Sequence, residues 1–398
     1  MGIAEGEADE LAHWLRLALT PGVGPVAARR LLDRFGLPDA IFHASEAAVR
    51  EAVGPRLADA LRRPDAARER AIEASLEWAS HDAHHLVTLA DADYPASLLE
   101  IADPPALLWL RGHREAIARP MLAIVGARNA TAAGTAHARA FGHALSAAGW
   151  TIASGLALGI DAAAHAGALD GGAGTVAVLG TGIDVVYPSR HETLAGRIAA
   201  DGALLSELPP GTAPTPGGFP RRNRLIAGLS RGVLVVEAAL RSGSLITARH
   251  AAEAGREVFA IPGSIHSPLA RGCHALLREG AKLVETAEDV LAELPPSPRD
   301  ARPGEAARPE AGAPGVGPGT IARSGPPTFG GPPGGRADGP DRDPVLVAIG
   351  HEPVLPDALA ARLELPSGEL GARLVMLELA GRLLRLPDGR VVRPPPVG

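Results

Sequence analysis

The first 80 residues carry apolar side chains at the spacing of amphipathic helices. This spacing predicts helices over Leu11–Leu19, Ala27–Phe35 and Ala66–Trp78. The first two are joined by Thr20–Pro25, a tight turn whose two glycines leave backbone N–H groups free to meet a phosphate. The pattern predicts a helix-hairpin-helix, which serves either as a DNA contact or only as a connection between helices. We assign residues 1–84 to this helical domain.

Short β-rich runs alternate with helical segments in residues 85–295. Nearly continuous apolar runs are typical of strands in a parallel sheet that helices cover on both faces. The alternation therefore predicts an α/β domain, an extended Rossmann-like fold with a doubly wound parallel sheet. The predicted strands are Met121–Val125, Trp150–Ser154, Thr175–Leu179, Ala203–Ser206, Val233–Glu237 and Glu257–Ile261.

The periodic pattern stops in residues 296–343, which are rich in Pro, Gly, Ala and Arg. Such a segment cannot bury enough apolar area to offset its ordering entropy, so we expect a disordered linker. Residues 344–398 again predict three helices, followed by a hairpin around the Asp388-Gly389 turn. The helices are Pro344–Ile349, Leu355–Leu363 and Ser367–Ala380. This order predicts a winged helix, and the acidic Glu369 and Glu378 in its third helix favour a folded module without DNA contact over a DNA-binding one.

Composition narrows the class of protein. The formal net charge is -6, so any contact with nucleic acid has to come from a local basic surface. Cys273 is the single cysteine, which excludes a disulfide within the chain. The first residues lack the apolar core of a signal peptide, and no apolar run of about 18 residues is present. We therefore expect a cytoplasmic protein.

Glycine-rich segments follow the predicted strands, where parallel sheets bind their ligands. Gly126 and Arg128 come between a strand and a helix, and the arginine replaces the second glycine of a dinucleotide-binding loop. An arginine there suits a phosphodiester better than a pyrophosphate. Gly155 opens the next loop. Asp161 and His165 follow four residues apart, but no third ligand is near them in sequence, so we expect no metal.

Two further segments carry candidate phosphate-binding residues. Arg190 follows a glycine turn in which Tyr187 either stacks on a base or packs internally. Arg221–Arg224 places three arginines ahead of a strand, and Ser242–Ser244 offers small hydroxyl residues at a helix start, as in a phosphate cradle. Between residues 215 and 282 there are ten basic and four acidic residues, a net +6. This excess favours an anion larger than one phosphate, and pairing with local carboxylates is the alternative.

Four blocks of this sequence resemble the DNA-processing protein A (DprA/Smf) family over roughly residues 85–295. They are IVGARNATAAGTAHAR, IASGLALGIDAAAHAGAL, VAVLGTGIDVVYPSRHETL and FPRRNRLIAGLSRGVLVVEAALRSGSLITA. The resemblance implies a homodimer that binds single-stranded DNA at the strand ends and loads RecA during natural transformation or recombination. With Gly155 added from its place at a strand end, the candidate DNA-binding residues are Gly126, Arg128, Gly155, Arg190, Arg222, Asn223, Arg224, Ser242, Gly243 and Ser244.

Two positions depart from the family pattern. Leu158 stands where members often carry a basic residue within SGLA-x-GID, and His274 stands where many carry asparagine. Each departure removes or alters one expected polar contact.

An enzyme is the main alternative. Rossmann proteins related to nucleotide phosphoribohydrolases carry P-G-G-x-G-T-x-x-E, but here Pro216–Gly218 runs directly into Phe219-Pro220. Glu207 and Glu237 are the plausible carboxylate catalysts, and neither has an evident partner in sequence. Nucleophile-elbow and Walker A motifs are missing. We expect no catalytic residue and no cofactor. A nucleotide-sensing module is a third possibility, which the arginine density disfavours.

Overall fold

The computed structural model describes residues 5–295, 344–349, 354–363 and shorter stretches up to residue 392. The chain divides into two compact units, residues 1–303 and 304–398. The predicted linker, residues 296–343, lies outside the described residues. Within the described ranges, no helix combines the length and the apolar character needed to cross a membrane.

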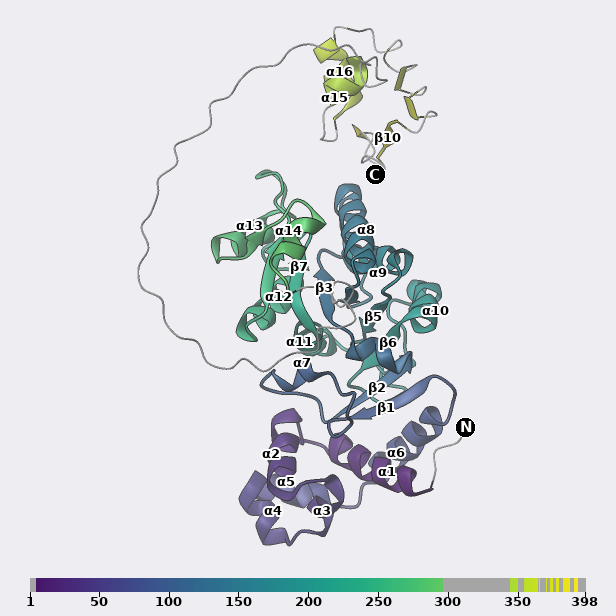
Figure 1. Ribbon diagram of the computed structural model, residues 1–398, viewed down its shortest axis with the longest axis vertical. Coiled ribbons are helices and arrows are strands. Elements are labelled where there is room, and N and C mark those ends of the chain that lie inside the picture. Colours follow the sequence, from purple (N-terminus) through teal and green to yellow (C-terminus); the bar gives the residue numbers. More distant parts are fainter. Residues whose placement is uncertain are drawn as a thin grey trace, which may run out of the picture. The chain divides into compact units, whose positions relative to one another are not determined.

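A mixed sheet forms the centre of the first unit (Figure 1). The strands are β1 (His84–Thr88), β2 (Leu107–Gly112), β3 (Met121–Val125), β4 (Thr151–Ser154), β5 (Thr175–Val178), β6 (Ala203–Ser206), β7 (Ser230–Val235), β8 (Glu257–Ala260) and β9 (Lys282–Leu283). Their order is β1-β2-β6-β5-β4-β3-β7-β8-β9. All neighbours in the part β6-β5-β4-β3-β7-β8-β9 pair in parallel, whereas the β1–β2 and β2–β6 pairs are antiparallel. The α/β prediction is confirmed, with an antiparallel edge that the sequence analysis missed.

Helices cover both faces of this sheet. They are α7 (Ala96–Leu99), α8 (Ala132–Ala147), α9 (Ile160–Gly171), α10 (Glu192–Asp201), α11 (Gly218–Leu229), α12 (Ser244–Glu253), α13 (Arg271–Arg278) and α14 (Ala287–Ala292). One face packs against α7, α11, α12 and α13, and the other against α8, α9, α10 and α14. This is the doubly wound arrangement that the sequence predicts.

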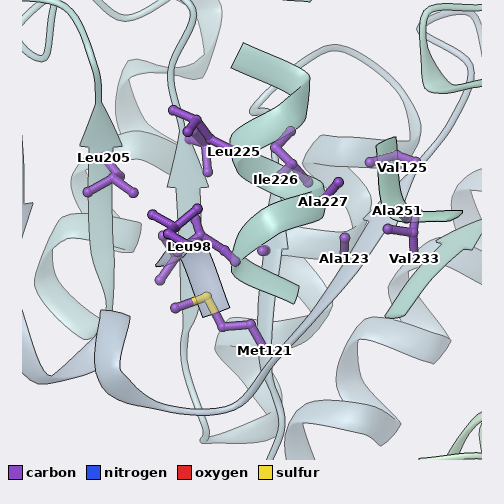
Figure 2. Packing of buried hydrophobic residues seen from close by; sticks show 14 of the residues in the cluster. Leu98, Met121, Ala123, Val125, Leu205, Leu225, Ile226, Ala227, Val233 and Ala251 are labelled. Carbon is purple, nitrogen blue, oxygen red and sulfur yellow. The ribbon is translucent and has the colours of Figure 1, made fainter. Parts of the chain in front are cut away.

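Strand β3 shows why its apolar run is continuous. Met121, Ala123 and Val125 face the α11 side, while Leu122 and Ile124 face the α8 side. Because successive side chains of a strand alternate between faces, a strand buried on both faces needs apolar residues at every position. Figure 2 shows the first set with Leu225 and Ile226 of α11 in the same buried cluster.

The N-terminal helices pack on the antiparallel edge of the sheet. They are α1 (Glu5–Leu19), α2 (Pro25–Phe35), α3 (Pro38–His43), α4 (Glu46–Val53), α5 (Pro55–Arg62) and α6 (Ala66–Ala79). The three helices expected from apolar spacing match α1, α2 and α6. Trp14 and Leu15 of α1 share one buried cluster with Leu86 of β1 and Trp109 of β2. The helical domain and the sheet therefore have a common core.

The described residues of the second unit form two of the predicted helices and the predicted hairpin of a winged helix. They are α15 (Pro344–Ile349), α16 (Pro356–Leu363), β10 (Leu384–Arg385) and β11 (Val391–Val392). Strands β10 and β11 pair antiparallel, and Leu346, Leu359 and Leu374 share a buried cluster. The predicted helix Ser367–Ala380 lies partly outside the described residues.

Candidate nucleic-acid interface

The sheet changes winding direction at β3. The chain passes from β3 to β4 and β5 on one side, and it reaches β7 on the other side only after β6. Loops that leave the carboxyl ends of β3 and β7 therefore diverge toward opposite faces, and ligands of open α/β sheets bind at such a point. The loops here are Gly126–Thr131, which leads into α8, and Val236–Gly243, which leads into α12.

The arginine block lies on a helix. FPRRNR occupies the first turns of α11, which begins at Gly218 beside the carboxyl end of β5. A Cβ atom on Gly180, just after β5, would lie 2.8 Å from the Phe219 ring. The glycine at this strand end thus allows the helix to approach closely.

Arg222 of α11 points into the protein and is only 6% exposed. Its guanidinium donates to the carbonyl oxygen of Gly155, at 2.8 Å, and to that of Val178, at the ends of β4 and β5. A Cβ atom on Gly155 would lie 2.4 Å from this guanidinium, so the glycine is needed for the contact. Burial lowers the pKa of Arg222 to about 10, against an opposing effect of Asp161, so the side chain stays charged at neutral pH. Arg222 holds two strand ends together.

Arg224 is also turned inward. Its Nη2 donates to both carboxylate oxygens of Glu207 at 2.6 Å, and its Nη1 donates to the carbonyl oxygen of Asp103 at 2.8 Å. Arg221 reaches the same Glu207 at 3.3 Å, with its side chain 53% exposed. Pairing with local carboxylates therefore applies to both Arg221 and Arg224. Since Arg222 and Arg224 are both engaged internally, their contact with phosphate stays a prediction.

Arg128 is exposed and lies against an aromatic pair. Its guanidinium carbon is 5.4 Å from the centroid of the Phe219 ring. The Phe219 ring in turn lies 5.5 Å from that of Tyr187, at an interplanar angle of 38°, and Tyr187 is 47% exposed. We call Arg128, Tyr187 and Phe219 the Arg128 cluster. It joins the loops after β3 and β5 to the start of α11. Phe219 is not among the residues that the sequence pattern singles out, although a phenylalanine next to the arginine block in a chain with few aromatics is a usable signal.

The remaining candidates lie along the same edge. Arg190 is exposed in the short 3₁₀ helix Ser189–His191, and His191 Nδ1 lies 2.9 Å from the carbonyl oxygen of Leu156 in the loop after β4. Asn223 Nδ2 donates to the carbonyl oxygen of Gly243 at 3.2 Å, which links α11 to the loop after β7. Ser242 and Ser244 are joined through their hydroxyl groups at 2.7 Å.

The close packing of these loops also involves Gly126 and the two positions that depart from the family pattern. A Cβ atom on Gly126 would lie 2.6 Å from Ile160, so this glycine allows α9 to pack on the loop. Leu158 is half-buried in the loop after β4. His274 Nε2 lies 3.0 Å from the carbonyl oxygen of Gly263, an internal contact.

The strand-end carboxylates are engaged in structural contacts. Glu237 accepts hydrogen bonds from the amide nitrogen of Thr131 at 2.9 Å and from its hydroxyl at 2.5 Å, at the first turn of α8. Glu207 is held by Arg224. Asp161 accepts from the amide nitrogen of Gly155 at 3.1 Å. The part of the chain that the structure describes contains no cluster of three side chains suited to a metal ion.

Comparison with known proteins agrees with this architecture. The family model for DNA recombination-mediator protein A matches residues 85–295. The chain belongs to the DNA recombination-mediator protein A family. A second family model, the DprA winged helix domain, matches residues 331–389. The resemblance to the DprA/Smf family is thereby confirmed.

Relatives in this family cover most of the chain. Protein Smf of Escherichia coli (strain K12) is 39% identical over 330 residues, which are 81% of each chain. Protein Smf of Synechocystis sp. (strain PCC 6803) is 36% identical over 97% of this chain and 99% of its own. The X-ray structure of DNA processing protein A (DprA) from Streptococcus pneumoniae is similar with a TM-score of 0.62 at 37% identity, over 74% of this chain and 99% of that one.

Proposed function

We propose that this family member is a non-enzymatic mediator that binds single-stranded DNA along the carboxyl edge of its sheet and loads RecA onto it. The Arg128 cluster is the observation that carries the proposal. It places a cation and exposed aromatic surface together beside the point where the sheet changes winding direction.

The charges available at this edge suit a chain of phosphates. Arg128, Arg190 and Arg241 are exposed in the loops after β3, β5 and β7, and residues 5–295 offer none of them an ion pair. Cations on successive loops match a ligand with successive phosphates. Tyr187 adds a stacking surface that any unpaired base can use, which favours a single strand over a duplex.

The state of the carboxylates supports a role without catalysis. Hydrolysis of a nucleotide needs a carboxylate that is free to accept a proton from water or to hold one for the leaving group. Glu207 makes a two-oxygen ion pair with Arg224, and Glu237 is bound to Thr131. Neither is available without breaking a structural contact, so we disfavour the phosphoribohydrolase alternative.

The proposal includes homodimerisation, RecA loading and a role in natural transformation, which the resemblance to the DprA/Smf family implies. Two copies would bring two carboxyl edges onto one strand, which raises the apparent affinity for long DNA. We expect the protein to act in the cytoplasm.

The test is fluorescence anisotropy of the full chain with labelled poly-dT and with duplex of equal length, at several salt concentrations. We expect tighter binding to the single strand and a steep salt dependence, because phosphate contacts release counterions. RecA filament formation on the same poly-dT should then start sooner with the protein present. Equal affinity for duplex, or no binding at low salt, would overturn the proposal.

A further inference from the structure

The N-terminal helical domain contains a cavity of about 310 Å³ that is separate from the carboxyl edge of the sheet. Helices α1, α3, α4, α5 and α6 contribute its walls. The lining residues are Arg16, Ile41, Phe42, Val49, Leu61, Arg62, Arg68 and Glu69. Pockets for small molecules start at roughly this volume, and they combine apolar walls with a few polar groups.

The charged side chains of the cavity do not balance. Three arginines face one carboxylate, which leaves a net charge of +2. Arg16 donates to Glu69 at 2.9 Å, and this hydrogen bond lowers the pKa of Glu69, so the carboxylate is charged at neutral pH. Arg62 forms no ion pair with the described residues, and its Nη2 donates to the carbonyl oxygen of Ala44 at 2.5 Å. Part of the positive charge therefore has no matching anion.

Arg68 is the buried member, with 6% of its surface exposed. Its Nη1 donates to the hydroxyl of Thr20 at 3.1 Å, and its Nη2 donates to the carbonyl oxygen of Arg63 at 3.1 Å. Its Nε is buried without a hydrogen bond to the described residues, although it forms an ion pair with a carboxylate oxygen of Glu69 at 3.5 Å. Buried donors of native proteins almost always have a hydrogen-bond acceptor, so a ligand oxygen could complete the bonding of this Nε beside Glu69.

Apolar side chains complete the lining of the cavity. Ile41 and Val49 are buried, as is Leu61. Beside them the Phe42 ring lies 5.8 Å from the guanidinium carbon of Arg16. A ligand that fills this space needs an anionic group for the arginines and an apolar or planar body for the apolar side chains.

We propose that this cavity binds a small phosphate monoester of the nucleoside monophosphate class. A phosphate monoester carries a charge of about -1.5 to -2 at neutral pH, which matches the excess of the lining. Guanidinium groups bind such oxygens in pairs, so Arg62 and Arg68 would hold the phosphate. The nucleoside would then cover Ile41, Phe42, Val49 and Leu61. This site is independent of the proposed DNA-binding edge.

The test is isothermal titration of the full chain with AMP and with adenosine, which lacks the phosphate. We expect AMP to bind at one site per chain, and adenosine to bind at least about tenfold more weakly because it lacks the charge-assisted hydrogen bonds. Absence of AMP binding at millimolar concentration, or equal binding of adenosine, would overturn the proposal.

Charge reversals locate the site. Arg62→Glu should weaken AMP binding by at least about tenfold, since it removes the excess positive charge of the lining. Arg63→Glu is the matched control, because Arg63 is the exposed neighbour that does not line the cavity. Equal losses in both variants would contradict the site. Arg128→Ala should leave AMP affinity unchanged, and loss of AMP binding in that variant would assign the nucleotide to the carboxyl edge instead.

Discussion

Two groups of arginines from the same candidate interface have opposite environments. Arg222 and Arg224 of α11 are buried and bonded to carbonyl and carboxylate oxygens of the protein. Arg128 and Arg190, in the loops after β3 and β5, are exposed, and the structure between residues 5 and 295 gives neither a carboxylate partner. The local excess of arginine in the sequence therefore overstates the charge that a ligand can meet.

The contrast is sharpest within α11 itself. Arg221 and Arg224 both contact Glu207, but the Arg221 side chain is 53% exposed and the Arg224 side chain 9%. An exposed ion pair contributes little to stability. Removing one partner of a buried ion pair destabilises the protein strongly, because the other charge is left buried without compensation. We expect the inward arginines to support the fold and the outward ones to support binding.

The largest expected effect is on stability. Arg224→Ala should lower the free energy of unfolding by about 3 kcal/mol, because the largely buried Glu207 carboxylate then keeps only the longer contact from Arg221, at 3.3 Å. Arg221→Ala, which removes the exposed contact to the same carboxylate, should cost less than about 1 kcal/mol. Urea unfolding of the two variants measures both values.

The same pair of variants can break the comparison. If Arg224→Ala kept full stability but lost affinity for poly-dT, this arginine would belong with the ligand-binding residues. Equal destabilisation by both substitutions would show that burial does not separate the two arginines.

Sequence patterns predicted the central strands well and the arginine block poorly. Strands such as β3 are buried on both faces, so their apolar runs are unmistakable, whereas β1 carries two half-buried histidines and was missed. The start of α11 was not predicted, because Gly217, Gly218 and Pro220 are typical of a loop. Proline is nevertheless tolerated in a first helical turn.

Helical periodicity, once applied to this segment, explains the burial of Arg222. It lies on one face of α11 with Leu225, Ile226 and Leu229, all of which are buried. Contact between Arg128 and Phe219 joins two distant segments, and no local pattern predicts it. The loops of the site were thus predictable, and the direction of each arginine was not.

The next largest effect is a pH dependence of stability, which comes from His165 near the buried Arg222. His165 is fully buried, its Nδ1 lies 2.7 Å from the Thr175 hydroxyl, and that hydroxyl donates to the carbonyl oxygen of Ile152. The hydroxyl proton is therefore used, so the imidazole donates from Nδ1 to the hydroxyl oxygen. Burial, with a smaller contribution from Arg222, lowers the pKa of His165 from 6.5 to about 3.

Between these two pKa values His165 is protonated in the unfolded chain and neutral in the folded chain. Stability therefore falls as pH decreases below about 6.5. This one group should lower the free energy of unfolding by about 2 kcal/mol between pH 7 and pH 5. Urea unfolding at both pH values measures it. His165→Gln should remove that part of the pH dependence, while His137→Gln, at an exposed position of α8, should keep it. An unchanged dependence in His165→Gln would show that a different group titrates.

The smallest effect concerns binding and tests the outward group. Arg128→Ala should weaken binding to poly-dT about tenfold, or ~1.4 kcal/mol, with no change in stability, because it removes one phosphate contact. The slope of log affinity against log salt should become shallower by about 0.7. Arg231→Ala is the control, since Arg231 is exposed near the start of β7, at the opposite end of the strand from the candidate loop. A similar loss in both variants would mean that general positive charge attracts the DNA, whereas a loss confined to Arg128→Ala places the strand at the carboxyl edge.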